Sequence, residues 1–345
     1  MPISQRSCIR KLPARSNRAR GGVAVLLTAL LLCTALLSLR CGSRDIPLAE
    51  LLEAFHREDS NDLARRILFY VRIPRTLAGG LAGCALALAG VLIQAVLNNA
   101  MASPNVIGVN AGAGFAAMLT AALAPSAGLM SLASFLGALA AALFIYALAA
   151  RAGLSRTTLI LAGVAVSSIL TAGTNALTLL YPDTAVGAAA FMLGGFSGVT
   201  LASIRAAGGY LAAGMLLAAL LAVDLDVLRL GEESAAGLGL HVNRTRFLAI
   251  LAAALLAGGA VSFSGLLGFV GLLVPHMARR LVGGDIRWLL PVSALLGGSF
   301  VLLCDVAARL LFAPFELPVG IVMSLLGGPF FLYLLLHHKR SRIYA

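Results

Sequence analysis

The chain has 345 residues, of which 60% are hydrophobic and 12% are charged, and its formal net charge is +12. Soluble globular domains carry about 25% charged residues, so this composition excludes an ordinary soluble domain and predicts an all-α integral membrane protein. The basic residues stand at the ends of apolar runs rather than on one soluble face, which argues against a nucleic-acid partner.

Apolar runs of about twenty residues, the length that a membrane-spanning helix needs, recur along the whole chain. The boundary between the seventh and eighth runs is the least defined, because Gly265–Gly271 is apolar throughout. The runs predict about ten transmembrane helices, an even number that places both termini on one side of the membrane. They are Gly21–Leu39, Thr76–Leu97, Val106–Leu123, Leu129–Ala149, Leu159–Leu180, Gly208–Val223, Phe247–Gly265, Leu267–Leu281, Leu289–Phe312 and Val319–Leu336.

The distribution of Lys and Arg predicts which side that is. Residues 1–20 form a basic N-terminal tail and residues 337–345 a basic C-terminal tail, and both are expected in the cytoplasm. Residues 21–336 then form one transmembrane domain. The first run is too long for the apolar part of a cleaved signal peptide, so we expect it to stay as a span. The segment 41–75, expected outside, departs from the rule because it contains several arginines: Arg44, Arg57, Arg65, Arg66, Arg72 and Arg75.

A polar, helix-prone island interrupts the apolar pattern at 228–246, with the sequence LRLGEESAAGLGLHVNRTR. Its flanking arginines predict a cytoplasmic position. A chain this apolar has little reason to keep such a segment out of lipid unless a soluble partner binds it. We therefore predict that the island is a contact site for a cytoplasmic protein.

A second irregular segment runs from Asn98 through Pro104 to Asn110 and on to Gly114, between two apolar runs. Proline and glycines there predict non-helical backbone that re-enters the membrane, which is tolerated only where protein or a water-filled cavity covers it. The segment either lines a translocation path or is a simple tight loop, and the residues alone favour neither. A weak similarity between Thr76–Leu97 and Thr245–Leu267 is typical of repeats in transporters but does not by itself establish one.

Charged residues within or beside the spans have two possible roles each. Arg72 and Arg75 flank Pro74 at the start of the second span, where they could anchor at lipid headgroups or dock an acidic partner. Asp305 and Arg309 have the i, i+4 spacing of a helix-stabilising pair, so we expect a salt bridge that faces protein or water.

The motifs of catalysis are missing from the sequence. It has no phosphate-binding loop of the form GxxxxGK[ST] and no metal-ligand spacing or catalytic constellation, so nucleotide chemistry must come from a partner and no cofactor is expected on this chain. An ion-coupled secondary transporter is the rival class, but it would need functional carboxylates inside the spans, and Asp305 is the one well inside.

Four long stretches resemble the FecCD-type family, the permease subunits of ABC importers for iron–siderophore, haem and cobalamin. The resemblance covers nearly everything after about Arg65. The stretches are RIPRTLAGGLAGCALALAGVLIQAVLNNAMASPNVIGVNAGAG (72–114), LRLGEESAAGLGL (228–240), SGLLGFVGLLVPHMARRLVGGDIRWLLPVSALLGG (264–298) and ELPVGIVMSLLGGPFFLYLLL (316–336).

This resemblance implies a type II ABC importer permease with ten transmembrane helices in the inner membrane and both termini in the cytoplasm. It implies a dimer, expected to be a homodimer, with the pathway on its two-fold axis. ATP-binding subunits, which carry ATP and Mg²⁺, would dock from the cytoplasm, and a substrate-binding protein would dock from outside. An iron chelate, siderophore or haem, is the expected substrate, and cobalamin is the alternative.

The resemblance also implies roles for individual residues. Two motifs depart from the family pattern: Arg156 stands where a small hydroxyl residue is expected, and 98–104 lacks the first proline of an Asn-Pro-Leu-Ala-x-Pro motif. The implied ATPase-coupling residues are Gly231, Glu232, Glu233 and Gly239; the docking residues for the binding protein are Arg72, Arg75 and Arg309; and the translocation path and inner gate comprise Asn98, Pro104, Asn110, Ser155, Arg156, Thr157 and Thr158.

Overall fold

The computed structural model describes residues 17–42, 63–124, 126–311 and 315–343, and every regular element within these ranges is a helix. The all-α prediction is therefore confirmed. Most of the predicted N-terminal tail, as well as Arg44 and Arg57, lie outside the described residues.

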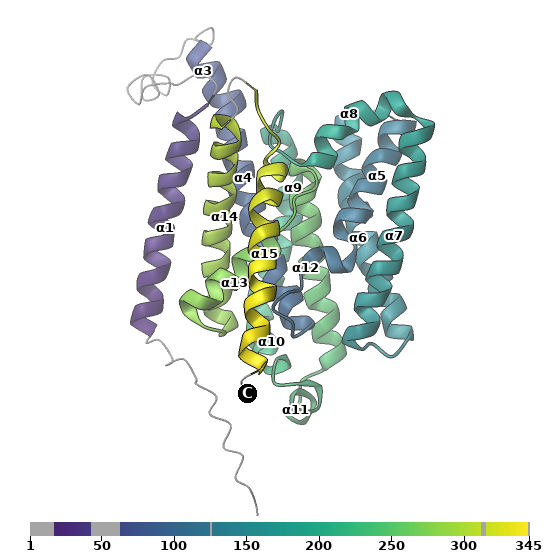
Figure 1. The fold of residues 1–345 in the computed structure, drawn as a ribbon, viewed down its shortest axis with the longest axis vertical. Coiled ribbons are helices and arrows are strands. Elements are labelled where there is room, and N and C mark those ends of the chain that lie inside the picture. Colours follow the sequence, from purple (N-terminus) through teal and green to yellow (C-terminus); the bar gives the residue numbers. More distant parts are fainter. Residues whose placement is uncertain (1–16, 43–62, 125, 312–314, 344–345) are drawn as a thin grey trace, which may run out of the picture.

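The helices form a single bundle whose long members run roughly parallel to one another (Figure 1). α3, the π-helical turn η1 and α4 are continuous from Leu63 to Val96, and 32 of these residues, Arg65–Val96, form one candidate membrane span. In chain order the elements are α1 (Asn17–Arg40), α3 (Leu63–Ile67), η1 (Leu68–Arg72), α4 (Ile73–Val96), the 3₁₀ turn η2 (Pro104–Ile107), α5 (Val109–Leu123), α6 (Ala127–Arg151), α7 (Arg156–Leu180), α8 (Pro182–Leu193), α9 (Leu201–Leu220), α10 (Ala222–Leu228), α11 (Glu232–Gly237), α12 (Val242–Ser264), α13 (Val270–Val282), α14 (Ile286–Leu310) and α15 (Val319–Ile343).

Seven helices in the described part of the chain are long and apolar enough to cross a membrane: α1, α4 with its preceding turns, α6, α7, α9, α12 and α14. α5 and the apolar part of α15, Val319–Leu334, are shorter. Each of the ten predicted apolar runs overlaps a helix, but the count of ten transmembrane helices is not established by this, because α13 has 13 residues, too few to cross a bilayer alone. The glycine-rich stretch after the seventh run is a true break, because α12 ends at Ser264 and α13 begins at Val270.

α4 and α12 form the centre of the bundle. In each, 78% of the most apolar 18-residue window is buried, whereas the value is 17% for α1 and α7. α4 packs against α14, α12 and α13, and α12 also packs against α9 and α6. These are the two helices whose sequences show the weak internal similarity, and each leads through an irregular segment into a shorter helix, α5 or α13.

Glycines set the spacing between α4 and its neighbours. Gly83 of α4 faces Gly297 of α14, and a Cβ added to either would overlap the carbonyl of the other. Gly90 of α4 approaches the backbone of Gly271 in α13 in the same way. Small residues at these positions allow the backbones to come into contact, as is common where helices pack in lipid.

The irregular segments predicted from proline and glycine lie inside the bundle. Between α4 and α5, Asn98 and Gly108 have φ angles of 44° and 72°, and Pro104 between them is buried. A side chain at Gly271 would collide with the Pro104 ring, and one at Gly163 of α7 would collide with the Val106 carbonyl. The backbone from Ile107 to Val109 is covered by protein, as the membrane interior requires, whereas Asn98 and Asn105 are exposed.

The bundle has two distinct ends (Figure 1). α1 begins and α15 ends at the end that carries α11, which we call the α11 end. The other end carries α3 and α8, and we call it the α8 end. α15 continues through the predicted domain boundary at 336/337 as far as Ile343.

We expect Gly83→Ala to lower the free energy of unfolding by about 1–3 kcal/mol, because the added methyl group overpacks the α4–α14 contact. Unfolding in mixed micelles titrated with SDS measures the change. Gly209→Ala is the matched control, since the space around Gly209 in α9 is open. Equal stability of the two variants would show that the Gly83 contact is not limiting.

Candidate functional site

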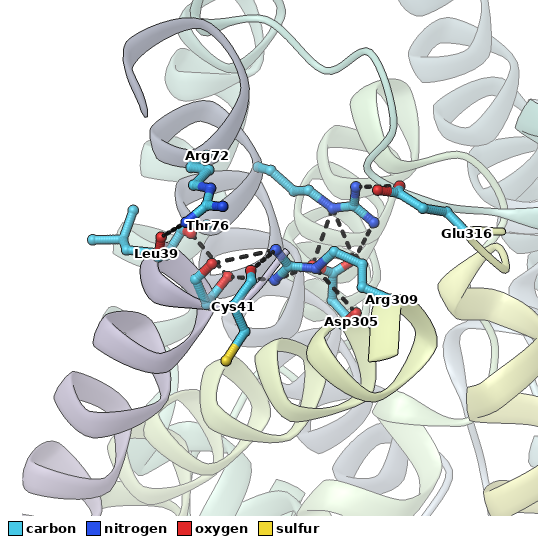
Figure 2. A network of polar contacts seen from close by, with 9 residues as sticks. Leu39, Cys41, Arg72, Thr76, Asp305, Arg309 and Glu316 are labelled. Atoms are coloured by element: carbon cyan, nitrogen blue, oxygen red, sulfur yellow. Dashed lines mark hydrogen bonds and ion pairs between the residues drawn. The ribbon is translucent and has the colours of Figure 1, made fainter. Parts of the chain in front are cut away.

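A buried carboxylate organises the α8 end. Asp305 of α14 is 1% exposed and accepts hydrogen bonds from Arg75 Nε at 3.1 Å and Arg75 Nη2 at 3.0 Å (Figure 2). Arg309, one turn further along α14, pairs with the same carboxylate at 3.1 Å. The salt bridge predicted from the i, i+4 spacing is therefore present, and Arg75 makes it a triad between α4 and α14.

Arg309 and a further arginine, Arg72, hold the C-terminal end of α1. The last carbonyls of a helix have no partner within the helix and carry partial negative charge. Arg309 Nη1 donates to the Cys41 carbonyl at 2.7 Å and to the Ser38 carbonyl at 3.3 Å. Arg72 Nη1 donates to the carbonyls of Leu39 at 2.6 Å and Arg40 at 2.7 Å. Two guanidinium groups thus cap one helix end, and Figure 2 shows both beside it.

Glu316 joins this network to the segment before α15. Its carboxylate pairs with Arg75 Nη1 at 2.6 Å, and its side chain is 34% exposed. Arg75 and Glu316 line a cavity of about 290 Å³ together with Ser197, Ser264 and residues of α8. Polar groups of both charges therefore face this cavity.

Arg72, Arg75 and Arg309, the predicted docking residues, do lie together at one end of the bundle, but in this single chain they are not open to a partner. They are 4%, 7% and 4% exposed, and their donors are used by Asp305, Glu316 and the end of α1. The sequence indicated the cluster, but it did not indicate that each arginine is already bound inside the chain.

At the α11 end, the predicted contact island forms a short helix held by two glycines. Gly231 and Gly239 have φ angles of 109° and 86°, which a residue with a side chain adopts only under strain. They turn the chain sharply before and after α11. Leu230 and Leu238 beside these turns are 64% and 67% exposed, and Glu233 also lies on the surface.

Glu232 is tied to the body of the bundle. Its carboxylate pairs with Arg246 of α12, and this hydrogen bond, with help from the charge of Arg156, holds the pKa of Glu232 below its usual range. Arg246 Nη1 also donates to the Leu154 carbonyl at 3.2 Å, in the turn between α6 and α7. Arg156, the departure from the family pattern, thus lies close enough to α11 to influence its first carboxylate.

The other residues of the predicted inner gate shape the start of α7. Ser155 is its N-cap, and its hydroxyl accepts a hydrogen bond from the Thr158 amide at 3.1 Å. Thr157 is exposed, whereas Thr158 is half-buried. Of the predicted path residues, Asn98 is exposed, Pro104 is buried, and Asn110 donates to the Leu267 carbonyl at 3.3 Å.

One groove, lined mostly by apolar atoms but with several polar side chains, was not predicted from the sequence. It has a volume of about 620 Å³ and lies along α7, beside the irregular segment before α5. Its polar lining includes Asn105, Ser167, Ser168, Thr171 and Asn175. The spacing of Ser167, Thr171 and Asn175, four residues apart within an apolar span, is the signal that could have revealed this polar face.

A further polar contact holds α10, the helix before α11, against the start of α14. Asp226 of α10 accepts hydrogen bonds from the Ile286 amide at 3.1 and 3.2 Å, at the start of α14. Burial raises the pKa of Asp226 against the effect of this amide. Asp285, the N-cap of α14, pairs with Arg20 of α1 at 3.0 Å. Among the described residues, no group of three or more His, Cys, Asp or Glu side chains could hold a metal ion.

Comparisons with known proteins give one consistent result. A model of the FecCD transport family matches residues 30–337. The iron(3+)-hydroxamate import system permease protein FhuB of Bacillus subtilis is 36% identical, over 98% of this chain and 93% of the relative. The cobalamin import system permease protein BtuC of Halobacterium salinarum is 40% identical, over 79% of this chain and 74% of the relative. A solved ABC transporter assigned to the metal-chelate type, in an inward-facing conformation, superposes with a TM-score of 0.82 at 27% identity and covers 92% of this chain and 99% of that chain.

We expect Asp305→Asn to destabilise the protein by about 3–5 kcal/mol, because two buried guanidinium groups lose their shared counter-charge. Glu316→Gln is the control: its carboxylate is partly exposed, and the loss there should stay below about 1 kcal/mol. SDS titration in mixed micelles compares the two variants. If Asp305→Asn were no more damaging than Glu316→Gln, the triad would not be a structural centre.

Proposed function

The chain belongs to the FecCD transport family, and from this premise we propose that it is the transmembrane permease subunit of a binding-protein-dependent ABC importer. The observation that carries the proposal is the extent of the match, which takes in nearly every helix of the bundle. A secondary transporter has no comparable support. The protein moves its substrate by alternating access, and ATP hydrolysis takes place on separate subunits that hold ATP and Mg²⁺.

The substrate is an iron chelate, such as a siderophore or haem. The bacterial hydroxamate permease aligns with 98% of this chain, whereas the archaeal cobalamin permease aligns with 79%. Cobalamin import is the alternative, favoured by the higher identity of that second relative, 40%. Both substrates are bulky metal chelates, so one transport mechanism serves either.

The α11 end faces the cytoplasm, where α11 binds an ATP-binding subunit. Exposed leucines beside a short helix suit burial in a partner, because each fully buried leucine contributes about 1.5–3 kcal/mol. Leu230, Leu238 and Glu233 supply the apolar and charged parts of this contact surface, and Gly231 and Gly239 set its angle. This orientation also places both termini in the cytoplasm.

A second permease subunit packs against the α7 side to form a homodimer. Of the seven spans, α1 and α7 are the least buried; the exposed face of α1 is mostly apolar, as lipid requires, whereas that of α7 carries Ser168, Thr171 and Asn175 among its apolar residues. Polar groups of this kind avoid lipid and face protein or water. The α7 groove therefore lines the translocation path between two copies, and 155–158 is its inner gate.

In this arrangement each subunit has the ten transmembrane helices of a type II importer, with α13 and the irregular segments buried against longer helices. The α8 end faces outward and receives the substrate-binding protein. If Arg72, Arg75 and Arg309 bind acidic residues of that protein, they must exchange their present partners to do so. Exchange at Arg75 is the simplest, because Glu316 is partly exposed.

The transport assay uses proteoliposomes that contain the permease with its ATP-binding subunits and binding protein. We expect ATP-dependent accumulation of ⁵⁵Fe supplied as a ferric hydroxamate, and none of ⁵⁷Co-cobalamin. Leu230→Asp combined with Leu238→Asp should weaken binding of the ATP-binding subunit by about tenfold or more and reduce uptake with it. Arg151→Gln, an exposed change at the same end, is the control. Uptake of cobalamin alone would favour the alternative substrate, and uptake of none of ferric hydroxamate, haem and cobalamin would contradict the importer assignment.

The path is tested by the reaction of cysteines with a charged maleimide in the assembled dimer, in a background whose native cysteines are serines. Thr171→Cys should react about ten times faster than Leu36→Cys, because each pKa unit of thiol desolvation reduces the thiolate about tenfold. Leu36 lies on the apolar face of α1. Equal reactivity would place the α7 face in lipid and remove the basis for the path.

A further inference from the structure

One buried side chain contacts both α11 and the turn that leads into α7. Arg246 of α12 is 4% exposed. Its Nη2 pairs with the Glu232 carboxylate on α11, and its Nη1 donates to the Leu154 carbonyl at 3.2 Å. The planar guanidinium presents donors in fixed directions, so both contacts constrain one rigid group. A shift of Glu232 therefore changes the position of the Leu154 carbonyl unless one bond breaks.

The turn on the other side of Arg246 is compact and strained. Gly153 and Leu154 have φ angles of 95° and 42°, and the Leu154 amide donates to the Ala149 carbonyl at 2.7 Å. Leucine rarely adopts a positive φ, so surrounding contacts must hold this conformation. Ser155 follows directly as the N-cap of α7. The Leu154 carbonyl thus lies directly before the N-cap of the helix that lines the groove.

Other contacts hold the start of α12, which carries Arg246, against α6. Tyr146 of α6 donates to the Asn243 carbonyl at 3.3 Å, and its ring lies 5.3 Å from that of Phe247. These contacts join the start of α12 to α6. Within the described ranges, the hydrogen bonds that link residues 231–240 to residues 152–158 through one side chain are those of Arg246, and the charge of Arg156 acts on Glu232 beside them.

We propose that Arg246 is a positioning residue that transmits displacement of α11 to the turn 152–155 and so to the start of α7. This inference rests on the proposed function, in which a soluble partner displaces α11. The Glu232–Arg246–Leu154 connection makes the turn respond to the partner at a distance from the contact surface. Glu232 then serves mainly to pass the displacement of α11 to Arg246, while Glu233 and the exposed leucines Leu230 and Leu238 form the surface that contacts the partner.

The test is hydrogen–deuterium exchange of the full-length permease in nanodiscs, with and without the ATP-binding subunits. In the wild type, partner binding should change amide exchange in both 232–240 and 152–158. In Arg246→Gln the change at 232–240 should persist, while that at 152–158 should fall by about fivefold or more, the scale of a typical coupling between two sites. Arg246→Lys, which keeps the charge but loses the two-directional donor geometry, should behave like Arg246→Gln.

Two comparisons keep the outcomes distinct. Glu232→Gln alters a half-exposed carboxylate and should leave the fold intact, yet it should reduce the exchange response at 152–158 as Arg246→Gln does. The double variant Glu232→Gln with Arg246→Gln should show no further reduction, since both residues act in one connection. Arg151→Gln removes a nearby exposed charge and should respond like the wild type. A wild-type response at 152–158 in both Arg246 variants would overturn the proposal.

Failure of the proposed function has a different signature. If the ATP-binding subunits leave exchange at 232–240 unchanged in the wild type, the partner assignment is wrong. The connection is then judged without partners: Arg246→Gln and Glu232→Gln should each raise exchange at 152–158, and Arg151→Gln should not. Absence of that rise would overturn the connection itself.

Discussion

The buried charges of the α8 end persist because each finds an opposite charge or a backbone dipole within the same chain. Removing an ion from water is costly, and a membrane interior offers no solvent to compensate. Asp305 meets this constraint by lying between Arg75 and Arg309, and Arg309 also binds carbonyls at the end of α1. The positions of α1, α4 and α14 at the α8 end are therefore interdependent, since moving one helix leaves a charge unpaired.

The same principle organises the opposite end in a looser form. Arg246, Asp226 and Asp285 each join a helix to a neighbouring turn, but Glu232 and the residues around α11 remain partly exposed. Exposed ion pairs contribute little to stability and exchange partners readily. The α8 end is thus built from buried charges, whereas the α11 end is built from contacts that a soluble partner can rearrange.

The fold was largely predictable, because apolar length and glycine or proline breaks report directly on helices and their ends. The island at 228–246, the break after Asn98 and the Asp305–Arg309 pair follow from local residue spacing. The partners of Arg75 and Arg246 do not, since Asp305 and Leu154 are distant in sequence and meet only when helices pack. The α7 groove was missed for another reason: Ser167, Thr171 and Asn175 are individually unremarkable in a transmembrane helix, and their common exposure becomes apparent only once the buried face of α7 is known.

The π-helical turn η1 sets how the face of α3 is rotated relative to that of α4. Arg72 at its end binds the end of α1, and Arg75 in the first turn of α4 binds Asp305. A π turn is equivalent to one inserted residue, and one residue corresponds to about 100° of rotation about the helix axis. Deletion of a single residue within Leu68–Arg72 would straighten the turn and rotate α3 about the helix axis by that angle relative to α4. The face that α3 turns toward the rest of the bundle is thus encoded by a one-residue register shift.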